Sequence, residues 1–390
     1  MTMRISAVET FIVTVPRDTP YLGPLGPGEH VNARGYLVRQ GNGTIYPTVD
    51  RSVAVRVTAA DGSIGWGETY GICAPRATCE IINDLLAPVL TGSEVDDVPA
   101  TWDRLYDLMR VRGCWAGFHG DALAAIDIAL WDLAGKAKGR PVRELIGPAV
   151  HSVIPSYLSG LPAATLAERV DLALNWQARG ITAFKFAAVV SHEGIVEEMA
   201  ALRSALGPDA DILIDLHWKF EPAEARALIA RLEPYRPGFV EAPLKPEDMS
   251  GLASLAAASP VPVAAGEEWY TSYEFANRLA FGPIAFVQPE MGHTGITQFL
   301  RIAEMAAQHG IAVAPHATIG AGIFLAASLQ ASATLPGLWK HEWQHSVFER
   351  NLKGLETDMG HGPEGYRLPS GPGLGVEPGH AFWAAAEAVA

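Results

Sequence analysis

Ionisable side chains recur at a nearly constant spacing in the second half of this chain, and each follows a short apolar run. Successive members are 30, 26, 26, 23, 26 and 26 residues apart. The series is Lys185, Asp215, Glu241, Glu267, Glu290, His316 and Glu342. A strand, a helix and two loops take roughly this length. Because parallel strands of a barrel place their carboxyl ends on one face, we expect these side chains to converge there.

Three carboxylates of the series come from consecutive expected strands: Asp215, Glu241 and Glu267. Carboxylates that share a cavity repel one another unless a proton or a cation neutralises them. A hard divalent cation suits such a group, and the all-oxygen ligand set favours Mg²⁺ over Zn²⁺. We therefore expect a Mg²⁺ site. A metal-dependent amidohydrolase barrel is the competing interpretation, but the first expected strand carries no His-x-His motif.

Two histidines stand near these carboxylates and could transfer protons. His316 follows the strand after Glu290, and a neighbouring carboxylate fixes the tautomer of a histidine and raises its basicity. His316 is therefore a candidate general base, although a structural His–Glu pair stays open. Asp215 and His217 lie two apart at the end of an apolar run, so on a strand they share one face. Alternatively, Asp215 caps the next helix and His217 is a loop histidine.

Composition and charge limit the class of protein. The 390 residues are 49% hydrophobic and 18% charged, which is typical of a globular protein with a large core. A net charge of −14 argues against sequence-independent binding to nucleic acid or to an anionic membrane. The three cysteines show no disulfide framework, and we find neither a signal peptide nor a bilayer-spanning run. We expect a cytoplasmic protein.

The N-terminal part of the chain predicts a small α+β unit. Asp61-Gly62 is a hairpin signal between two alternating runs. The expected strands cover 5–15, 52–58 and 64–68, and the expected helices cover about 76–90 and 98–112. Between the first two strands, Pro16–Glu29 is rich in Pro and Gly and has no periodicity. Such long loops are often lids over a site.

A helix over Asp121–Leu133 joins this unit to the repeating part, with Asp121 as its expected N-cap and Gly135 as its stop. Asp127 and Asp132 lie within it, and we expect both to be structural. The repeating strands begin with Ser152–Ser159. Beyond Glu342 the spacing fails, and we expect the last residues to pack back on the N-terminal unit.

The chain resembles the enolase superfamily, in its mandelate racemase-like branch, over nearly its full length. The motifs that carry the resemblance are Asp61–Glu68, Ala125–Lys136, Gly266–Trp269, Gln288–Glu290, Gly295–Thr297 and Pro372–Gly375. It implies a modified (β/α)7β TIM-like barrel over residues 126–354. An α+β capping domain, residues 1–125 completed by 355–390, would cover the barrel.

The resemblance also implies roles for the spaced residues. Asp215, Glu241 and Glu267 match the Mg²⁺ ligands of the family. Glu290 and His316 match its Asp–His dyad, with Glu in place of the usual Asp. The eighth-strand acid that hydrogen-bonds the substrate or its enediolate is matched by Glu342.

Two departures from the family pattern bear on the reaction. The second strand of the family often carries Lys-x-Lys, whereas this chain has Lys185 and then Ala187, so the second lysine base is missing. The Asp215-Leu-His217 run looks like the galactonate and mannonate dehydratase branches, in which this histidine is an acid/base group. The resemblance thus implies a Mg²⁺-dependent dehydratase of an acid sugar, an aldonate or an aldarate.

In that reaction His316, supported by Glu290, removes the C2 proton, and His217 protonates the departing 3-hydroxyl to give a 2-keto-3-deoxy acid. Lys185 and Glu342 stabilise the enediolate and bind substrate. An epimerase or racemase, a lactone cycloisomerase, and a non-catalytic sugar-acid binding protein stay open. Specificity is expected in the lid and near Tyr70, the remaining candidate for substrate binding. Family members commonly assemble, so we expect a homo-oligomer.

Overall fold

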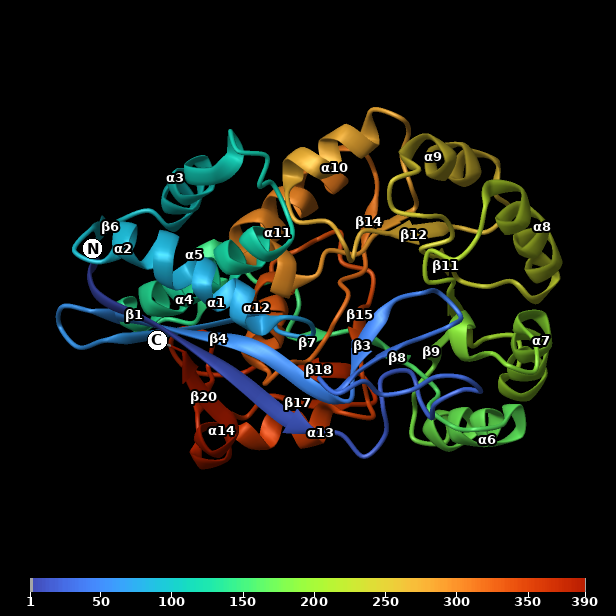
Figure 1. Ribbon diagram of the computed structural model, residues 1–390. Coiled ribbons are helices and arrows are strands. Elements are labelled where there is room, and N and C mark those ends of the chain that lie inside the picture. Colours follow the sequence, from blue (N-terminus) through green and yellow to red (C-terminus); the bar gives the residue numbers. More distant parts are fainter. Residues whose placement is uncertain (1–2, 390) are drawn as a thin grey trace.

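Eight short strands form one parallel sheet in the computed structural model, which describes residues 3–389 (Figure 1). In spatial order they are β14 (Ala312–Val313), β13 (Phe286–Val287), β12 (Val263–Ala265), β11 (Val240–Glu241), β10 (Asp211–Asp215), β9 (Ala183–Ala187), β8 (Ser156–Ser159) and β15 (His341–Trp343). The two ends of the sheet meet, since Val313 N donates to Gly337 O at 3.0 Å and Trp339 N donates to Val313 O at 2.8 Å. The sheet therefore closes into the expected barrel.

Helices cover the outside of the barrel, and apolar side chains fill it. The helices are α6 (Leu166–Gln177), α7 (Ile195–Leu206), α8 (Pro222–Leu232), α9 (Met249–Ala258), α10 (Ser272–Leu279), α11 (Met291–Gln308) and α12 (Ile323–Ser332). Inside, Tyr157, Leu213 and Phe239 pack in one buried cluster. Because this filling closes the lumen, a ligand can reach the barrel only at the ends of its strands.

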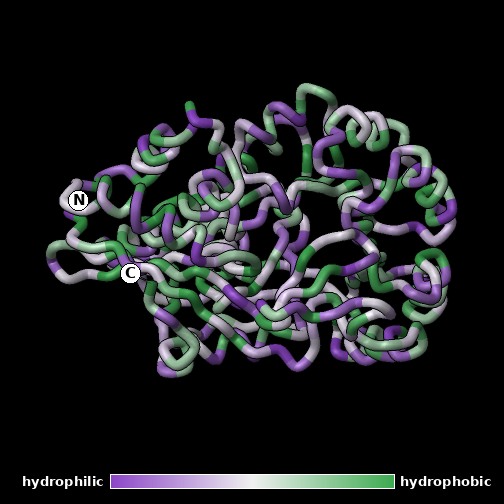
Figure 2. Tube along the Cα trace, viewed as in Figure 1, coloured by the Kyte–Doolittle hydropathy of each residue, from purple (hydrophilic) through white to green (hydrophobic). Residues whose placement is uncertain are grey.

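An antiparallel sheet forms the core of the capping domain. Its strands are β20 (Ala386–Val389), β1 (Met3–Pro16), β4 (Val49–Ala59) and β5 (Ile64–Tyr70), with β6 (Glu94–Val95) paired to β1. The helical segments α1 (Pro75–Ile81), α2 (Ala87–Leu90) and α3 (Val98–Arg110) follow, with a π-helical turn at Ile82–Leu86. Thr10 pairs with Val389, so the end of the chain does pack on the N-terminal unit. Figure 2 shows hydrophobic stretches running through both domains.

The remaining elements are short and lie between or after these units. They are β2 (Tyr36–Val38), β3 (Ile45–Pro47), α5 (Val142–Ile146), β7 (Val153–Ile154), α13 (Phe348–Asn351), β16 (Leu355–Glu356), β17 (Gly360–Gly362), β18 (Gly365–Arg367), β19 (Glu377–Pro378) and α14 (His380–Ala385). The first barrel strand was expected to be one run, but Pro155, which lacks an N–H, divides it into β7 and β8. Only β8 joins the barrel, and β7 pairs with β18. No helix of the described part is long and apolar enough to cross a membrane.

Helix α4 (Phe118–Lys138) differs from its expected limits at both ends, and it runs unbroken through the expected domain boundary at residue 125. Its N-cap is Gly117, whereas the Asp121 carboxylate lies 2.6 Å from His293 Nδ1. The helix ends at Lys138, with Gly139 rather than Gly135 as the glycine that stops it. A Cβ on Gly135 would lie 2.7 Å from Gly373 Cα, so this glycine permits close packing with the C-terminal segment instead of stopping the helix.

The two aspartates of α4 are structural, as expected. Asp132 is fully buried and accepts from Trp66 N and Leu374 N, both at 2.8 Å. Asp127 accepts from Thr297 N at 2.9 Å. Together they join α4 to the capping sheet, the C-terminal segment and α11.

We expect Asp132→Ala to lower the free energy of unfolding by about 3 kcal/mol, because two buried N–H groups and Lys136 would lose their acceptor. Urea denaturation measures this. Asp107→Ala is the control, since Asp107 forms only an exposed ion pair with Arg110 and its loss should change stability by less than about 0.5 kcal/mol. Equal stability of the two variants would contradict the assigned role of Asp132.

Candidate active site

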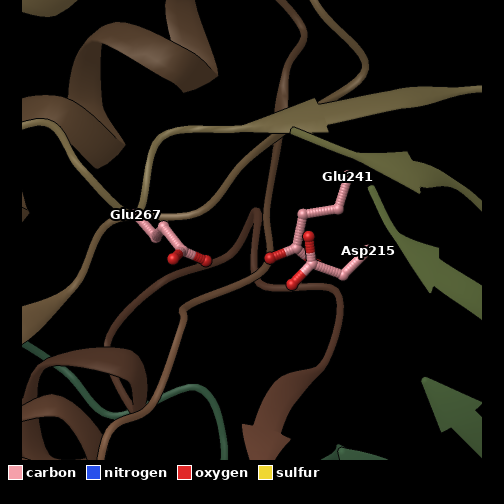
Figure 3. A group of neighbouring side chains, drawn as sticks. All are labelled: Asp215, Glu241 and Glu267. Atoms are coloured by element: carbon pink, nitrogen blue, oxygen red, sulfur yellow. The ribbon is translucent and has the colours of Figure 1, made fainter. Parts of the chain in front are cut away.

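Three carboxylates, of which Asp215 and Glu241 are buried and Glu267 is partly exposed, converge at the carboxyl ends of neighbouring strands (Figure 3). Asp215 ends β10, Glu241 ends β11, and Glu267 follows β12 by two residues. One oxygen of each lies within 4.8 Å of the others. The register of the strands explains this convergence, because Asp215 pairs directly with Glu241 across the sheet.

The cations around this cluster leave some of its oxygens without partners. Lys185 Nζ lies 2.7 Å from Glu241 Oε2, and His316 Nε2 lies 3.3 Å from Glu267 Oε2. Glu241 Oε1 and Glu267 Oε2 are nevertheless buried without a hydrogen bond to any atom of residues 3–389. Burial raises the pKa of Glu267 well above its usual range, and the neighbouring carboxylates add to the shift although His316 opposes it. Orphaned oxygens of several carboxylates fit a hard divalent cation.

The His316–Glu290 pair has the geometry of a base and its orienting acid. His316 Nδ1 lies 2.7 Å from Glu290 Oε2. That oxygen also accepts from Thr318 N at 2.9 Å and from Tyr70 Oη at 3.1 Å. Because Nδ1 is bound to Glu290, Nε2 is the ring nitrogen that can accept a proton from a substrate. Nε2 points towards the carboxylate cluster. Burial lowers the pKa of His316, but Glu267, Glu342 and Glu290 outweigh it and raise the pKa well above its usual value.

His217 reaches the same site by a different route from the one expected. Strand β10 ends at Asp215, and His217 has a left-handed φ of 51°, so alternation along a strand does not place it. A turn does, because His217 N donates to Asp215 Oδ1 at 2.8 Å. Its Nδ1 lies 3.0 Å from Asp215 Oδ2. Asp215 is not a helix cap, since Glu221 occupies that position for α8.

Lys185 and Glu342 complete the floor of the site. Lys185 Nζ bridges Glu241 and Glu342 Oε1, the latter at 3.1 Å. Burial lowers the pKa of Lys185, but these two carboxylates raise it well above its usual value, so the ammonium stays charged. Ala187 lines the same cavity, where the family pattern has its second lysine. A charged Lys185 beside Ala187 leaves the second strand without a base.

A cavity of about 320 Å³ opens above these groups. The lid contributes Arg17–Gly23 to its lining, and β5 contributes Tyr70. Tyr70 also donates from its hydroxyl to Glu290, so it helps to hold the dyad, and its contact with substrate stays a prediction. His30, at the end of the expected lid, is not among the lining residues.

Several lining residues were not found from the sequence. They include Tyr46, Thr318, Gln344, Arg169 and Arg350. Tyr46 lies on β3, Arg169 and Arg350 lie on helices, and the other two lie in loops, so these residues follow no common spacing. Only the position of Arg17 at the start of the expected lid indicated from the sequence that it could line the cavity.

Comparison with known protein families matches both domains. Residues 168–381 match the enolase C-terminal domain-like family, and residues 45–147 match the N-terminal domain of the mandelate racemase / muconate lactonizing enzyme family. The chain belongs to this family of the enolase superfamily. It is therefore an enzyme, and the resemblance drawn from its motifs is confirmed.

Curated members of the superfamily match most of the chain. A D-galactonate dehydratase of Verminephrobacter eiseniae is 32% identical, over 86% of this chain and 90% of that protein. A D-galactarolactone cycloisomerase of Agrobacterium fabrum is 29% identical, over 96% of both proteins. Among solved structures, an enolase superfamily member from Agrobacterium tumefaciens is 53% identical, with complete coverage of both chains and a TM-score of 0.97.

We expect Mg²⁺ to raise the free energy of unfolding, by about 2.7 kcal/mol at a concentration of 100 times Kd. Glu267→Gln should abolish this response without lowering the stability of the metal-free protein, because the substitution removes a repelling charge. Denaturation with Mg²⁺ or with EDTA measures both effects. Glu304→Gln, on the exposed face of α11, is the control and should respond as the parent does. A parent protein indifferent to Mg²⁺ and EDTA would contradict the site.

Proposed function

We propose that this enzyme is a Mg²⁺-dependent dehydratase of an acid sugar. The observation that carries the proposal is the pair of cavity histidines, each with Nδ1 held by a carboxylate, on different strand ends around one carboxylate cluster. One can act as a base and the other as an acid. The D-galactonate dehydratase among the relatives supports this reaction class.

The chemistry begins at C2 of the substrate. The proton α to a carboxylate is too weakly acidic for a free histidine to remove. Mg²⁺ held by Asp215, Glu241 and Glu267 would supply positive charge against the negative charge that the substrate carboxylate gains as this proton leaves. His316 takes the proton on Nε2 while Glu290 holds its Nδ1. The ammonium of Lys185 and the carboxyl group of Glu342 stabilise the resulting enediolate.

Elimination then requires an acid at C3. His217 lines the cavity and is held by Asp215 through Nδ1, which leaves Nε2 for the departing hydroxyl group. Burial lowers the pKa of His217, but the neighbouring Asp215 carboxylate more than compensates and raises it. Loss of the 3-hydroxyl as water gives an enol, which tautomerises to a 2-keto-3-deoxy acid.

Lactone cycloisomerisation is the second candidate. The D-galactarolactone cycloisomerase that matches 96% of the chain favours it, and this reaction also needs one base and one acid. Ala187 weighs against a racemase, because exchange between the two faces of C2 needs a base on each face. Epimerisation through His217, or non-catalytic binding of a sugar acid, would each give a different result in the experiment below. A cytoplasmic homo-oligomer remains our expectation for the protein in the cell.

We expect His316→Asn to abolish both deuterium exchange at C2 and dehydration, with a loss of at least about 100-fold, because the base is removed. His217→Asn should stop dehydration and leave C2 exchange in place. Incubation with a library of acid sugars and Mg²⁺ in D₂O measures both, by NMR for exchange and by a 2-keto acid assay for dehydration.

His309→Asn is the matched control, because His309 is exposed at the end of α11 and should leave both rates unchanged. Normal dehydration by His217→Asn would exclude it as the acid. Exchange without any 2-keto acid in the parent would favour an epimerase, and a ring-opened product from a lactone would favour the cycloisomerase. Binding without exchange or turnover would indicate a sugar-acid binder.

A further inference from the structure

Asp50, near the start of β4, binds two arginines that come from distant parts of the chain. Arg17 Nη1 lies 2.6 Å from Asp50 Oδ1, and Arg350 Nη2 lies 2.6 Å from Asp50 Oδ2. Arg17 belongs to the lid and Arg350 to α13, and both line the cavity. Two guanidinium groups against one carboxylate leave a positive charge that is not balanced within this triad.

Each of these arginines keeps one terminal nitrogen without a partner. Arg17 Nε donates to Thr19 O at 3.0 Å, and Arg350 Nε donates to Asn351 Oδ1 at 3.2 Å. Within the described residues, Arg17 Nη2 and Arg350 Nη1 have no acceptor. The two side chains are only 10% and 27% exposed. Neither nitrogen is among the buried side-chain atoms that lack a hydrogen bond, so both stay accessible, and both side chains line the cavity, where an anionic ligand could accept from them.

Arg169 shows that this is not a general property of arginines in the cavity wall. It lines the same cavity, but its Nε binds Ala163 O at 3.1 Å and its Nη1 binds Glu198 at 2.7 Å. Its Nη2 donates to Val190 O. All three nitrogens of Arg169 are thus used within the protein, as in a structural arginine.

The arginine pair lines the same cavity as Asp215 and Glu267 of the carboxylate cluster. In the closed ring of eight strands, β15 is the fourth strand from β11 in either direction. Arg350 lies on α13, the helix that follows β15, whereas Glu241 ends β11. Because the cluster and the arginines share one cavity, a ligand held at the cluster by one end can place its other end against the arginines. The volume of about 320 Å³ lies within the range of small-molecule sites.

We propose that Arg17 and Arg350 bind a second anionic group at the far end of the substrate, so that the substrate is an aldarate, a sugar diacid, rather than an aldonate. This inference rests on the proposed function. The planar guanidinium forms charge-assisted hydrogen bonds with a carboxylate, and Asp50 holds both groups in place for it. A terminal phosphate could accept the same hydrogen bonds. The experiment below distinguishes a substrate with a terminal phosphate from one with a second carboxylate.

The wild-type holoenzyme is first assayed in Mg²⁺ with stereochemically matched pairs: galactarate and galactonate, glucarate and gluconate, and mannarate and mannonate. A 6-phosphogluconate arm tests the phosphate. We expect kcat/KM for the accepted aldarate to exceed that of its aldonate by at least about tenfold, the loss that one unmade charge-assisted bond produces. Equal or better use of the aldonate overturns the inference, and a preference for the phosphate overturns the diacid assignment.

Variants then separate anion binding from a mechanical role, because the Arg17–Asp50 pair could also hold the lid closed. Arg350→Met should lower the aldarate-to-aldonate ratio of kcat/KM by at least about tenfold, mainly through KM for the aldarate. Arg17→Met should shift the ratio in the same direction. Ser346→Ala, a neutral change in the same wall, is the control and should keep the ratio. Equal losses on both substrates would assign the triad to lid closure and overturn the inference.

Failure of the proposed function has a separate signature. Absence of both turnover and C2 exchange with every acid sugar overturns the dehydratase proposal and this inference with it. Exchange or dehydration of aldonates alone supports the reaction and overturns only the diacid assignment. Because the ratio is measured within one variant, a partly unfolded preparation lowers both rates and leaves the ratio unchanged.

Discussion

Repulsion among three closely placed carboxylates is the constraint on which the rest of the site depends. Asp215, Glu241 and Glu267 place like charges within 4.8 Å of one another, and the first two of these side chains are buried. Such an arrangement costs free energy unless opposite charge is held nearby. Lys185 and His316 supply part of that charge from β9 and from the end of β14. The closed barrel fixes the strand ends that carry these groups, so the three carboxylates stay close together although their charges repel.

The metal-ligand candidates could be predicted from the sequence because a βα unit has a nearly fixed length. Residues separated by one such length therefore lie side by side at the ends of neighbouring strands. Asp215 and Glu241, which pair across β10 and β11, are an example. His217 was predicted in the right place for the wrong reason. The β10 strand stops at Asp215, and a left-handed turn that the periodicity does not reveal carries His217 into the cavity. Local pattern identifies the strand but not the conformation that follows it.

Tertiary packing explains the other differences. Glycine is both a helix stop and a point of close approach, and the sequence does not distinguish the two uses. At Gly135 the second applies, because the C-terminal segment packs against α4 there. The triad of Arg17, Asp50 and Arg350 could not be predicted from the sequence either. Its members belong to three elements far apart in the chain, and their contact exists only because the capping domain sits on the mouth of the barrel.

The capping domain does more than bound the cavity, because one of its strands also touches the dyad. Tyr70 lies at the end of β5, and its hydroxyl donates to the Glu290 oxygen that binds His316. The hydrogen bond from Tyr70 spreads part of the negative charge of Glu290 and fixes the carboxylate in place. The orientation of the proposed base therefore depends on how the two domains are packed together. A change in β5 that altered substrate choice would for this reason also change the position of Glu290 and the orientation of His316.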